Sequence, residues 1–477
     1  MGKKNKHVIL EQVPVTDYAA EGKALARIDG KVIFIEGAVP GDTANVLLTK
    51  NKKDWAEGRA MQITAFSPDR VEPFCIHFGT CGGCKWQMLP YEKQLEYKQQ
   101  EALQNIQRIG KVEIGEIFPI RGSEKTRQYR NKLEFTFSNK RFLTSAEIDK
   151  SQAIPQQDAL GFHVPRIFDK VLDIFECHLL DPVNNRIRNT LRDIAKAEGF
   201  SFYDIRQHTG WLRNVIIRYA TTGELMVNIC LNYEAEDDRK KLLDQLLAAV
   251  PEITTLLYTI NPKWNDSIFD LEPQVYTGKG FIMEKLGNYQ FMISPKSFFQ
   301  TNTQQAETLY SIAKDFAGLT GNEIVYDLYC GTGSIGIFLS DGAKKIIGVE
   351  LIEDAIADAK KNAELNNITH AEFFAGDVIK ICDDAFFATH GRPDVVITDP
   401  PRAGMHEKLV LKLKEMRAQK IVYVSCNTAT QARDIALLAE LYEVTKLQPV
   451  DMFPHTHHIE SVALLSLKKD AGMNDNS

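Results

Sequence analysis

The sequence predicts a multidomain α/β chain whose last domain is a doubly wound sheet of mostly parallel strands. Short apolar runs rich in β-branched residues occur at 324–329, 345–350, 394–398 and 421–424, separated by segments of helical length. Each run ends in a turn of small or reactive residues. Because the carboxyl ends of parallel strands meet at one edge of such a sheet, we expect these turns to line a single crevice.

Length and composition set the broad class of the protein. The chain has 477 residues, of which 44% are hydrophobic and 25% charged, so it is long enough for two or three globular cores. Its net charge of −6 does not indicate a nucleic-acid binder, although a local basic face would suffice for one. No apolar run reaches the ~20 residues that span a bilayer, and no apolar segment follows the basic start at 1–6. We therefore expect a cytoplasmic protein with no membrane partner and no obligate protein partner.

The first unit, residues 1–67, has the pattern of a small β-barrel. Strand-like runs at 8–10, 24–27, 32–35 and 44–48 recur at regular spacing, which is typical of an OB-like barrel. Its later part contains basic residues around an aromatic one, namely Lys50, Lys52, Lys53 and Arg59 with Trp55. Such an edge suits an RNA backbone and stacked bases. A solvated surface with one packed tryptophan explains it equally well.

A cysteine cluster follows the barrel. Cys75, Cys81 and Cys84 have the spacing C-x5-C-x2-C, and three thiolates within ten residues indicate a metal. Zinc and an iron–sulfur cluster both require a fourth ligand. Cys177 is the best candidate, with a core cysteine as the alternative, whereas His77 would compete with closure of the loop by the cysteines. Eight cysteines in a cytoplasmic chain do not predict a disulfide framework.

The middle region, residues 68–289, is predicted to be an α+β domain without a catalytic signal of its own. Helical spacing occurs at 90–110 and again at 181–198, where three arginines suggest a basic face. Strand patterns occur at 129–137, 211–219 and 223–231, the last two as a pair, and polar residues at 139–158 indicate an insertion or a long loop.

The crevice, in the unit 290–477, begins with a glycine-rich turn. Gly331, Gly333 and Gly336 follow one strand and open a helix, which lets a ligand approach the backbone closely. About twenty residues later, Glu350 ends the next strand, where a carboxylate binds ribose hydroxyls. These features fit a dinucleotide enzyme or an S-adenosylmethionine enzyme.

Two further carboxylates favour methyl transfer. Asp377 follows a third strand, placed for an adenine amino group, and Asp399-Pro400-Pro401 ends a fourth, beside a transferable methyl group. A dehydrogenase has no use for the second motif. Arg402 stands where methyltransferases of amino groups often have an aromatic residue, which argues against an exocyclic amine and leaves a carbon target open.

Carbon 5 of a pyrimidine is a weak nucleophile until a thiolate adds to C6. Cys426, at the end of the next strand, is the candidate for that thiolate. A base must then remove the C5 proton, and Glu460, before the last apolar run, is the best candidate. His455, His457 and His458 compete for this role or contact phosphate.

These residues resemble the RNA (uracil-5-)-methyltransferase family, and specifically its iron–sulfur branch acting on 23S ribosomal RNA. The resemblance covers nearly the whole chain and rests on the cysteine loop and the segments 297–300 (SFFQ), 327–333 (DLYCGTG) and 424–427 (VSCN). It implies an RNA-binding TRAM domain at 1–67, a central α+β domain at 68–289 and a Rossmann-like methyltransferase domain at 290–477. It also implies a [4Fe–4S] cluster with the ligands Cys75, Cys81, Cys84 and Cys177.

The resemblance implies roles for the crevice as well. Cys426 matches the nucleophile and Glu460 the base, and the residues that match S-adenosylmethionine contacts are Gln300, Tyr329, Ser334, Glu350, Asp377 and Asp399. Tyr329 replaces the usual phenylalanine, and Ser334 stands where some members have asparagine. The implied reaction is methylation of C5 of a specific uridine in 23S ribosomal RNA. The same chemistry on transfer RNA, a non-catalytic RNA-binding assembly factor, and zinc in place of the cluster are the alternatives.

Overall fold

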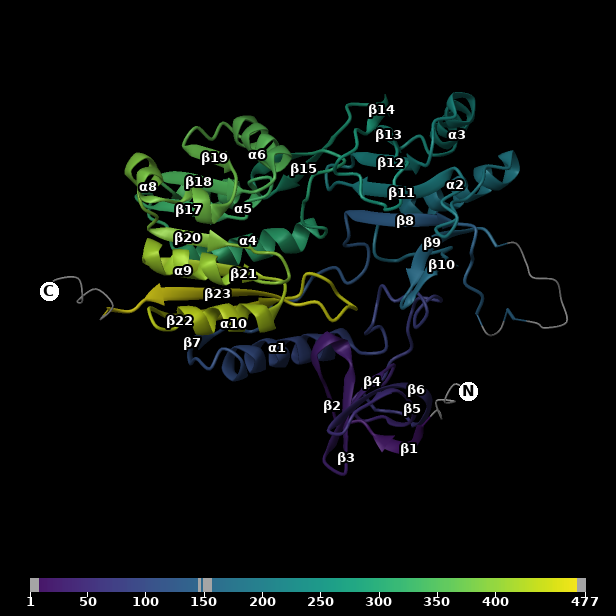
Figure 1. Cartoon of the computed structure of the whole chain (residues 1–477), viewed down its shortest axis with the longest axis horizontal. Coiled ribbons are helices and arrows are strands. Elements are labelled where there is room, and N and C mark those ends of the chain that lie inside the picture. Colours follow the sequence, from purple (N-terminus) through teal and green to yellow (C-terminus); the bar gives the residue numbers. More distant parts are fainter. Residues whose placement is uncertain (1–7, 145–146, 149–156, 470–477) are drawn as a thin grey trace.

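The structure is a computed structural model that describes residues 8–144, 147–148 and 157–469. A β-rich N-terminal unit, a central sheet and a larger C-terminal α/β unit follow one another along the chain (Figure 1). Most of the long loop predicted at 139–158 lies outside the described residues. Within the described part of the chain, no helix combines the length and the apolar character needed to cross a bilayer.

The N-terminal unit is a curved sheet around a small aliphatic core. In the described residues it has six strands in the order β1-β5-β6-β4-β3-β2. Alternate side chains of the strands point inward, and the core consists of small residues such as Ala26, Ile33, Ile35 and Val46. The strands are β1 (Ile9–Pro14), β2 (Asp17–Tyr18), β3 (Ala24–Ile28), β4 (Lys31–Glu36), β5 (Thr43–Asn51) and β6 (Trp55–Ala65), with the short helix η1 (Ala20–Gly22).

The central unit is a sheet covered by two helices. As far as the structure describes it, the strand order is β10-β9-β8-β11-β12-β13-β14, and α2 and α3 pack over the sheet and against each other. The predicted strand pair is confirmed as β11 and β12, which are antiparallel. The elements are β8 (Lys132–Ser138), β9 (Ala159–Val164), β10 (Ile167–Asp173), α2 (Val183–Glu198), β11 (Leu212–Tyr219), β12 (Leu225–Leu231), α3 (Glu236–Ala249), β13 (Thr255–Ile260) and β14 (Gln274–Thr277).

The predicted basic face of α2 is wrong for two of its three arginines. Arg188 and Arg192 are buried, at 0% and 2% exposure. Their guanidinium groups donate to main-chain carbonyls, and Arg192 also lies 2.8 Å from a carboxylate oxygen of Asp173. These acceptors satisfy most of the donors, although Nε of Arg192 has no partner in the described part of the chain, and they offset the cost of burying the charge. Only Arg186 of the three remains on the surface.

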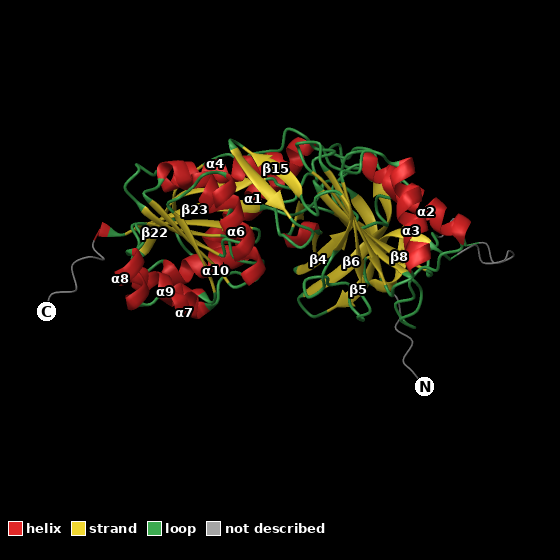
Figure 2. Ribbon diagram, turned by 90° about the horizontal axis from the view of Figure 1, so that it is seen from above, coloured by secondary structure: helices red, strands yellow, loops and turns green. Residues whose placement is uncertain are grey.

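The C-terminal unit is a doubly wound sheet, as predicted. Its strands in the described region follow the order β19-β18-β17-β20-β21-β23-β22-β7. Helices α4, α5 and α6 cover one face, and α1 with α7 to α10 covers the other (Figure 2). Alternation along β21 explains how one strand supports both layers: Val422 and Val424 face α4, whereas Ile421 and Tyr423 face α9 and α10.

The predicted strands of this unit are confirmed with small shifts of their ends. The strands are β17 (Ile324–Leu328), β18 (Lys345–Glu350), β19 (Ala371–Ala375), β20 (Val395–Thr398), β21 (Lys420–Ser425), β22 (Tyr442–Val450) and β23 (Glu460–Leu467). The helices are α4 (Thr303–Ala317), α5 (Ser334–Leu339), η2 (Ser340–Gly342), α6 (Glu353–Leu365), α7 (Val378–Ile381), α8 (Asp384–His390), α9 (Glu407–Met416) and α10 (Thr428–Leu438).

Some elements that precede residue 290 belong to this C-terminal layer. Helix α1 (Tyr91–Arg108), predicted at 90–110, packs against α10, and β7 (Ile114–Ile117) pairs in parallel with β22. The hairpin of β15 (Ile282–Leu286) and β16 (Tyr289–Ile293) packs on α4, α5 and α6. Helix α1 therefore runs beneath the C-terminal sheet, with the N-terminal strands below it in the same view (Figure 1).

Candidate active site

The strand order of the C-terminal sheet reverses between β17 and β20, and the glycine-rich turn lies at that point. Gly331 and Gly333 have φ angles of 53° and 77°, in the left-handed region that favours glycine. The amide of Gly336 donates to the Asp327 carboxylate at 2.9 Å, and a Cβ on Gly336 would lie 3.0 Å from the same oxygen. A Cβ on Gly331 would meet nothing within 4 Å, so open space lies over this turn.

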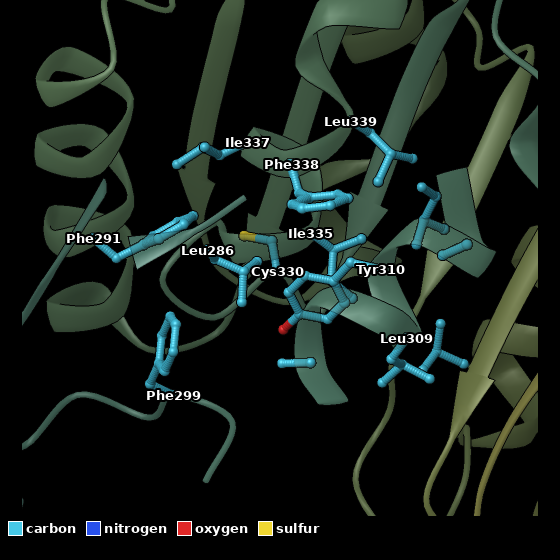
Figure 3. Close-up of a cluster of buried hydrophobic side chains, with 14 of the residues drawn as sticks. Leu286, Phe291, Phe299, Leu309, Tyr310, Cys330, Ile335, Ile337, Phe338 and Leu339 are labelled. Carbon is cyan, nitrogen blue, oxygen red and sulfur yellow. The ribbon is translucent and has the colours of Figure 1, made fainter. Parts of the chain in front are cut away.

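An apolar cluster supports the turn from below. Tyr310 of α4, Cys330, Ile335 and Phe338 pack together there (Figure 3). The Tyr310 hydroxyl lies 2.9 Å from the Ser334 hydroxyl, in a hydrogen bond that fixes the first residue of α5. The Ser334 side chain, a predicted cofactor contact, is thus engaged by the protein itself.

The two carboxylates after β18 and β19 are fixed by backbone amides. Glu350 accepts from Gly331 N at 3.3 Å and from Ile352 N at 3.1 Å, so it joins two strand-end turns. Asp377 caps α7 by accepting from Ile379 N at 3.0 Å. Both carboxylates follow strands that run parallel to β17, which places them on the same edge of the sheet as the glycine turn.

The segment before α4 is held by the central unit. The Asn131 side chain donates to the main-chain oxygen of Gln300 at 2.8 Å, and Arg218 donates to that of Ser297 at 2.6 Å. Phe299 is buried in the apolar cluster, whereas Phe298 is 70% exposed. Gln300 therefore lies at the contact between the central and C-terminal units.

Cys426 directly follows β21, and its turn is tied to the turn after β20. Asn427 caps α10 through its side-chain oxygen, while its amide nitrogen donates to the carbonyl of Arg402 at 3.2 Å. The Thr430 hydroxyl donates to the same carbonyl at 3.3 Å. These bonds hold the Cys426 turn beside the turn that contains Asp399.

Strand register brings Cys426 and Glu460 together. Strands β21 and β23 are antiparallel, with Ser425 opposite Ser461. Cys426 and Glu460 are the residues that directly adjoin this last pair, so both lie at the same end of the two strands. Glu460 is 5% exposed, and the Cys426 thiol is half-buried.

The three acidic groups of the crevice all favour their protonated forms. Burial raises the pKa of Asp399 to about 7. Burial, together with the charge of Asp399, raises the pKa of Glu460 well above its ordinary value. Burial raises the pKa of the Cys426 thiol to about 11, and the two carboxylates add to this while Arg402 opposes it. Positive charge near this crevice would lower these pKa values and favour the ionised forms.

A buried network fixes the loop that precedes Glu460. Lys98 of α1 lies 2.7 Å from one carboxylate oxygen of Asp451, and the hydroxyl of Tyr91 donates to the other at 2.9 Å. Lys98 also donates to the carbonyl of Phe453 at 3.3 Å. The side chains of Lys98 and Asp451 are fully buried. The sequence did not indicate the role of Lys98. It shows only a charged residue in a helical segment, and the burial of that residue is visible only in the structure.

The three histidines of this loop are partly buried and lie near basic side chains, which both disfavour their charged forms. Burial lowers the pKa of His455 and of His458 to about 4, and that of His457 to about 3. Gln94 accepts from the His455 amide at 2.8 Å and lies 3.1 Å from its Nδ1 atom. Uncharged rings are poor partners for phosphate, so the phosphate role considered for them loses support.

The four predicted metal ligands line one cavity of about 390 Å³. Cys177 reaches it from the segment between β10 and α2, opposite the loop that carries Cys75, Cys81 and Cys84. Burial raises the pKa of the Cys81 thiol to about 11 and that of Cys84 to about 12. Among the described residues, no three His, Cys, Asp or Glu side chains are placed to hold a single metal ion.

The cavity and the crevice are joined by direct contacts. The amides of Lys85 and Trp86, next to Cys84, donate to the carbonyl of His455 at 2.8 and 3.0 Å. Arg130 lies on the cavity wall, and its guanidinium lies 5.0 Å from the ring centre of Phe453. The segment that carries the thiols therefore also holds the loop before Glu460.

Comparisons with known proteins agree with this geometry. The family model tRNA (Uracil-5-)-methyltransferase matches residues 213–468. An uncharacterized RNA methyltransferase of Bacteroides thetaiotaomicron is 52% identical over 94% of this chain and 100% of its own. One of Porphyromonas gingivalis is 50% identical over 94% and 98%.

Among solved structures, the Pyrococcus abyssi tRNA (uracil-54, C5)-methyltransferase in complex with S-adenosyl-L-homocysteine matches with a TM-score of 0.73 and 29% identity. The match covers 96% of this chain and 100% of that one. The family model covers more than half of this chain, and the two relatives cover nearly all of it. The protein is therefore an RNA methyltransferase and belongs to the RNA (uracil-5-)-methyltransferase family.

Proposed function

We propose that this enzyme methylates C5 of a specific uridine in 23S ribosomal RNA, with S-adenosylmethionine as donor and a covalent bond between Cys426 and uracil C6. One observation carries the chemical part of this proposal. The last paired residues of β21 and β23, Ser425 and Ser461, directly adjoin Cys426 and Glu460. Burial raises the pKa of the Cys426 thiol, and Glu460 and Asp399 both raise it further, so the three groups lie close together at this strand-end edge. A nucleophile and a base on one side of one crevice are what addition and elimination at adjacent carbons require.

The strand-end edge fits S-adenosylmethionine. Open space over Gly331 admits a ligand close to the backbone, and fixed carboxylates flank it. We assign Gln300, Tyr329, Glu350, Asp377 and Asp399 as the residues that hold the cofactor. Ser334 is hydrogen-bonded to Tyr310, and we propose that it helps to hold the cofactor by fixing the start of α5. When bound, the cofactor supplies an electrophilic methyl group and a positive charge near the crevice.

The chain's own residues then do the following. The Cys426 thiolate adds to uracil C6, which gives C5 the character of an enolate carbon, and C5 accepts the methyl group. The Glu460 carboxylate removes the C5 proton, and the bond between C6 and the Cys426 sulfur breaks as the ring double bond returns. Arg402 lowers the pKa of the Cys426 thiol and so favours its attacking form.

The cysteine cavity suits a multi-atom cluster better than a single ion. Four thiols line one cavity of about 390 Å³, which has room for a group of several atoms. We therefore propose that Cys75, Cys81, Cys84 and Cys177 hold a [4Fe–4S] cluster that shapes this segment and, through His455, the loop before Glu460. Anaerobic protein should show a broad absorption shoulder in the blue visible region, whereas zinc would give none.

The N-terminal unit is proposed to be an RNA-binding TRAM domain with an OB-like barrel. Lys50 lies 4.7 Å from the ring centre of Trp55, so a cation and an aromatic face are presented together on β5 and β6. This combination suits an RNA backbone and a stacked base.

The deciding experiment follows radiolabelled methyl transfer from S-adenosylmethionine to unmodified ribosomal RNA and, in parallel, to unmodified transfer RNA. Tritium at uracil C5 reports proton release in the same reaction. Methylation of the large ribosomal RNA with equal tritium loss supports both parts of the proposal. Methylation of other atoms, or transfer without tritium loss, would overturn the C5 chemistry.

Transfer RNA is the second candidate substrate. One observation favours it: the Pyrococcus abyssi enzyme, which matches nearly the whole chain, is a tRNA (uracil-54, C5)-methyltransferase. Activity on transfer RNA alone would keep the chemistry and replace the substrate. Cofactor binding without transfer to either RNA would favour a non-catalytic RNA-binding protein.

A further inference from the structure

Two polar atoms on the wall of the cysteine cavity are left without partners by the protein. They are Nε of Arg130 and Nδ1 of His163, and both side chains line the cavity beside the four thiols. Each atom is almost inaccessible to solvent, and neither has a hydrogen-bond partner among the described residues. Because leaving a buried polar atom unpaired costs free energy, the two atoms indicate that a further group belongs in this cavity.

The two arginines near the thiols differ in how their donors are used. Arg188 engages all three of its guanidinium nitrogens within the protein, with one carbonyl and the side-chain oxygens of Asn184 and Asn185, at 2.7 to 3.1 Å. Nε of Arg130 has no acceptor in the part of the chain that the structure describes. Arg188 is therefore bound into the fold, whereas Arg130 keeps a donor for whatever fills the cavity.

The positive charge of Arg130 also reaches the thiols. Burial raises the pKa of the Cys177 thiol, and Arg188 and Arg130 are among the groups that oppose this rise. A [4Fe–4S] cluster bound by four thiolates carries net negative charge and presents sulfur atoms as hydrogen-bond acceptors. A cation that also offers an N–H donor therefore suits the cluster proposed above.

The segment that carries Arg130 joins the cavity to the reaction crevice. The amide of Arg130 donates to the carbonyl of Leu179 at 2.8 Å, two residues after the fourth thiol. The preceding residue, Tyr129, is buried and donates from its hydroxyl to the carbonyl of Pro454 at 3.0 Å. The guanidinium itself lies over the ring of Phe453, 5.0 Å from its centre, in the loop that precedes the proposed base.

We propose that Arg130 donates from Nε to a sulfur of the cluster and, through its contact with the Phe453 ring, holds the loop that precedes Glu460. Arg130 is thus a positioning residue for methyl transfer. A filled cavity satisfies the donor and fixes the guanidinium against the aromatic ring, in a contact of the cation–π class. This inference rests on the proposed cluster and on the proposed C5 chemistry, but not on the choice of ribosomal over transfer RNA.

The first test is the reduction potential of the iron-loaded protein, measured anaerobically by titration of its visible spectrum. A hydrogen bond and a positive charge both favour the more negative, reduced cluster. We expect Arg130→Gln to lower the ratio of reduced to oxidised cluster at a fixed potential roughly tenfold, a shift of about 59 mV for one electron. Incomplete loading does not obscure this result, because the potential is a property of the loaded molecules. Arg186→Gln, at the exposed surface of α2, is the matched control and should leave the potential unchanged.

The second test separates this role from a general loss of structure. Phe453→Leu removes the ring but not the donor, so it should lower kcat/KM for methyl transfer roughly fivefold and leave the potential unchanged. Arg130→Gln should lower kcat/KM by a similar factor. The double variant should show no further loss, because the two changes remove the same contact.

An iron-loaded Arg130→Gln protein with the potential of wild type would overturn the inference. If that protein also bound RNA more weakly and with a smaller dependence on salt, Arg130 would instead contact the RNA backbone. Losses in kcat/KM that multiply independently in the double variant would overturn the link to the loop. Wild-type protein without iron would overturn the proposed cluster together with this inference. Failure of the proposed C5 chemistry would appear separately, as iron-loaded wild type that transfers no methyl group.

Discussion

The crevice and the cysteine cavity hold their reactive side chains in place in two different ways. In the crevice, Asp399, Cys426 and Glu460 stand at the ends of neighbouring strands, and the ladder of β20, β21 and β23 sets their positions. In the cavity, three thiols belong to a loop without regular structure, held by turns such as Phe78 N to Cys75 O at 3.0 Å. The sheet therefore fixes the side-chain positions in the crevice. In the cavity, we expect those positions to depend on the group that the thiols bind.

Replacement of the nucleophile should have the largest effect and should leave both regions folded. Cys426→Ala is expected to lower single-turnover methyl transfer by at least about 10⁴-fold, because C5 then lacks the activation that addition at C6 provides. Cofactor affinity, measured by calorimetry, should change little. Cys230→Ala, a buried cysteine of β12, is the control and should keep full activity. Retained methylation by Cys426→Ala would remove this residue from the mechanism.

Glu460→Gln should separate addition from elimination. Its isosteric amide preserves the strand pairing with Val450 but cannot take the C5 proton, so a covalent complex between protein and RNA should accumulate. Denaturing gels with labelled RNA measure it, and turnover should fall roughly 10²- to 10⁴-fold. The double variant with Cys426→Ala should form no adduct. Full turnover by Glu460→Gln would point to another base.

Loss of a cavity ligand should act on stability first and on the reaction second. Cys177→Ser is expected to lose iron and the visible chromophore and to lower Tm by roughly 5–15 °C, since a metal site contributes folding energy. Activity should fall mainly through KM, because the cysteine segment holds the loop before Glu460 through the carbonyl of His455. Cys382→Ser, outside the cavity, should retain all iron. Unchanged stability and iron content in Cys177→Ser would remove Cys177 from the set of ligands, and wild-type protein that binds no iron would show that the cavity holds no cluster.

The crevice was largely predictable from the sequence, because each of its turns follows a strand with a strong local pattern. The turn at 331–336 and Cys426 lie where the patterns place them. The pairing of β21 with β23 was beyond local patterns, since antiparallel register depends on contacts between distant segments. Its place before the last apolar run made Glu460 the candidate base, but the sequence could not show that its strand would pair with the strand before Cys426.

The features that sequence reasoning missed are those created between segments. Charged residues favour surfaces on average, and the backbone carbonyls at 160 and 174, together with Asp173, explain why Arg188 and Arg192 can be buried. Helical spacing at 91–108 predicted α1 but not that α1 would pack on the C-terminal sheet and bury Lys98 against Asp451. A small pocket likewise forms between residues 17–20 and residues 97–105 of α1, two segments that share no local sequence pattern.

The smallest predicted effect is on the free energy of unfolding. It depends on pH through Asp399 in the crevice and does not involve the cysteines of the cavity. The folded protein holds the pKa of Asp399 near 7, compared with 3.8 for an ordinary aspartate, because burial disfavours its charge. The folded state therefore binds more protons than the unfolded state between these values, and stability falls as pH rises from about 4 to 7. Asp399→Asn removes this cost, so it should be more stable than wild type at pH 8, by at most about 4 kcal/mol, and equally stable at pH 4.

Urea unfolding of the cofactor-free protein at pH 5 and pH 8 measures this difference, and Asp394→Asn, at the exposed start of the same strand, is the control. The gain should come with a loss of methyl transfer, since a charged group held out of water is unfavourable for folding and useful for binding a cation. An Asp399→Asn protein whose stability relative to wild type is the same at both pH values would show that the Asp399 carboxyl is hydrated like a surface group. In that case burial in the crevice would not set the ionisation of Asp399, and a bound ligand would have to do so, as we propose for the thiols of the cavity.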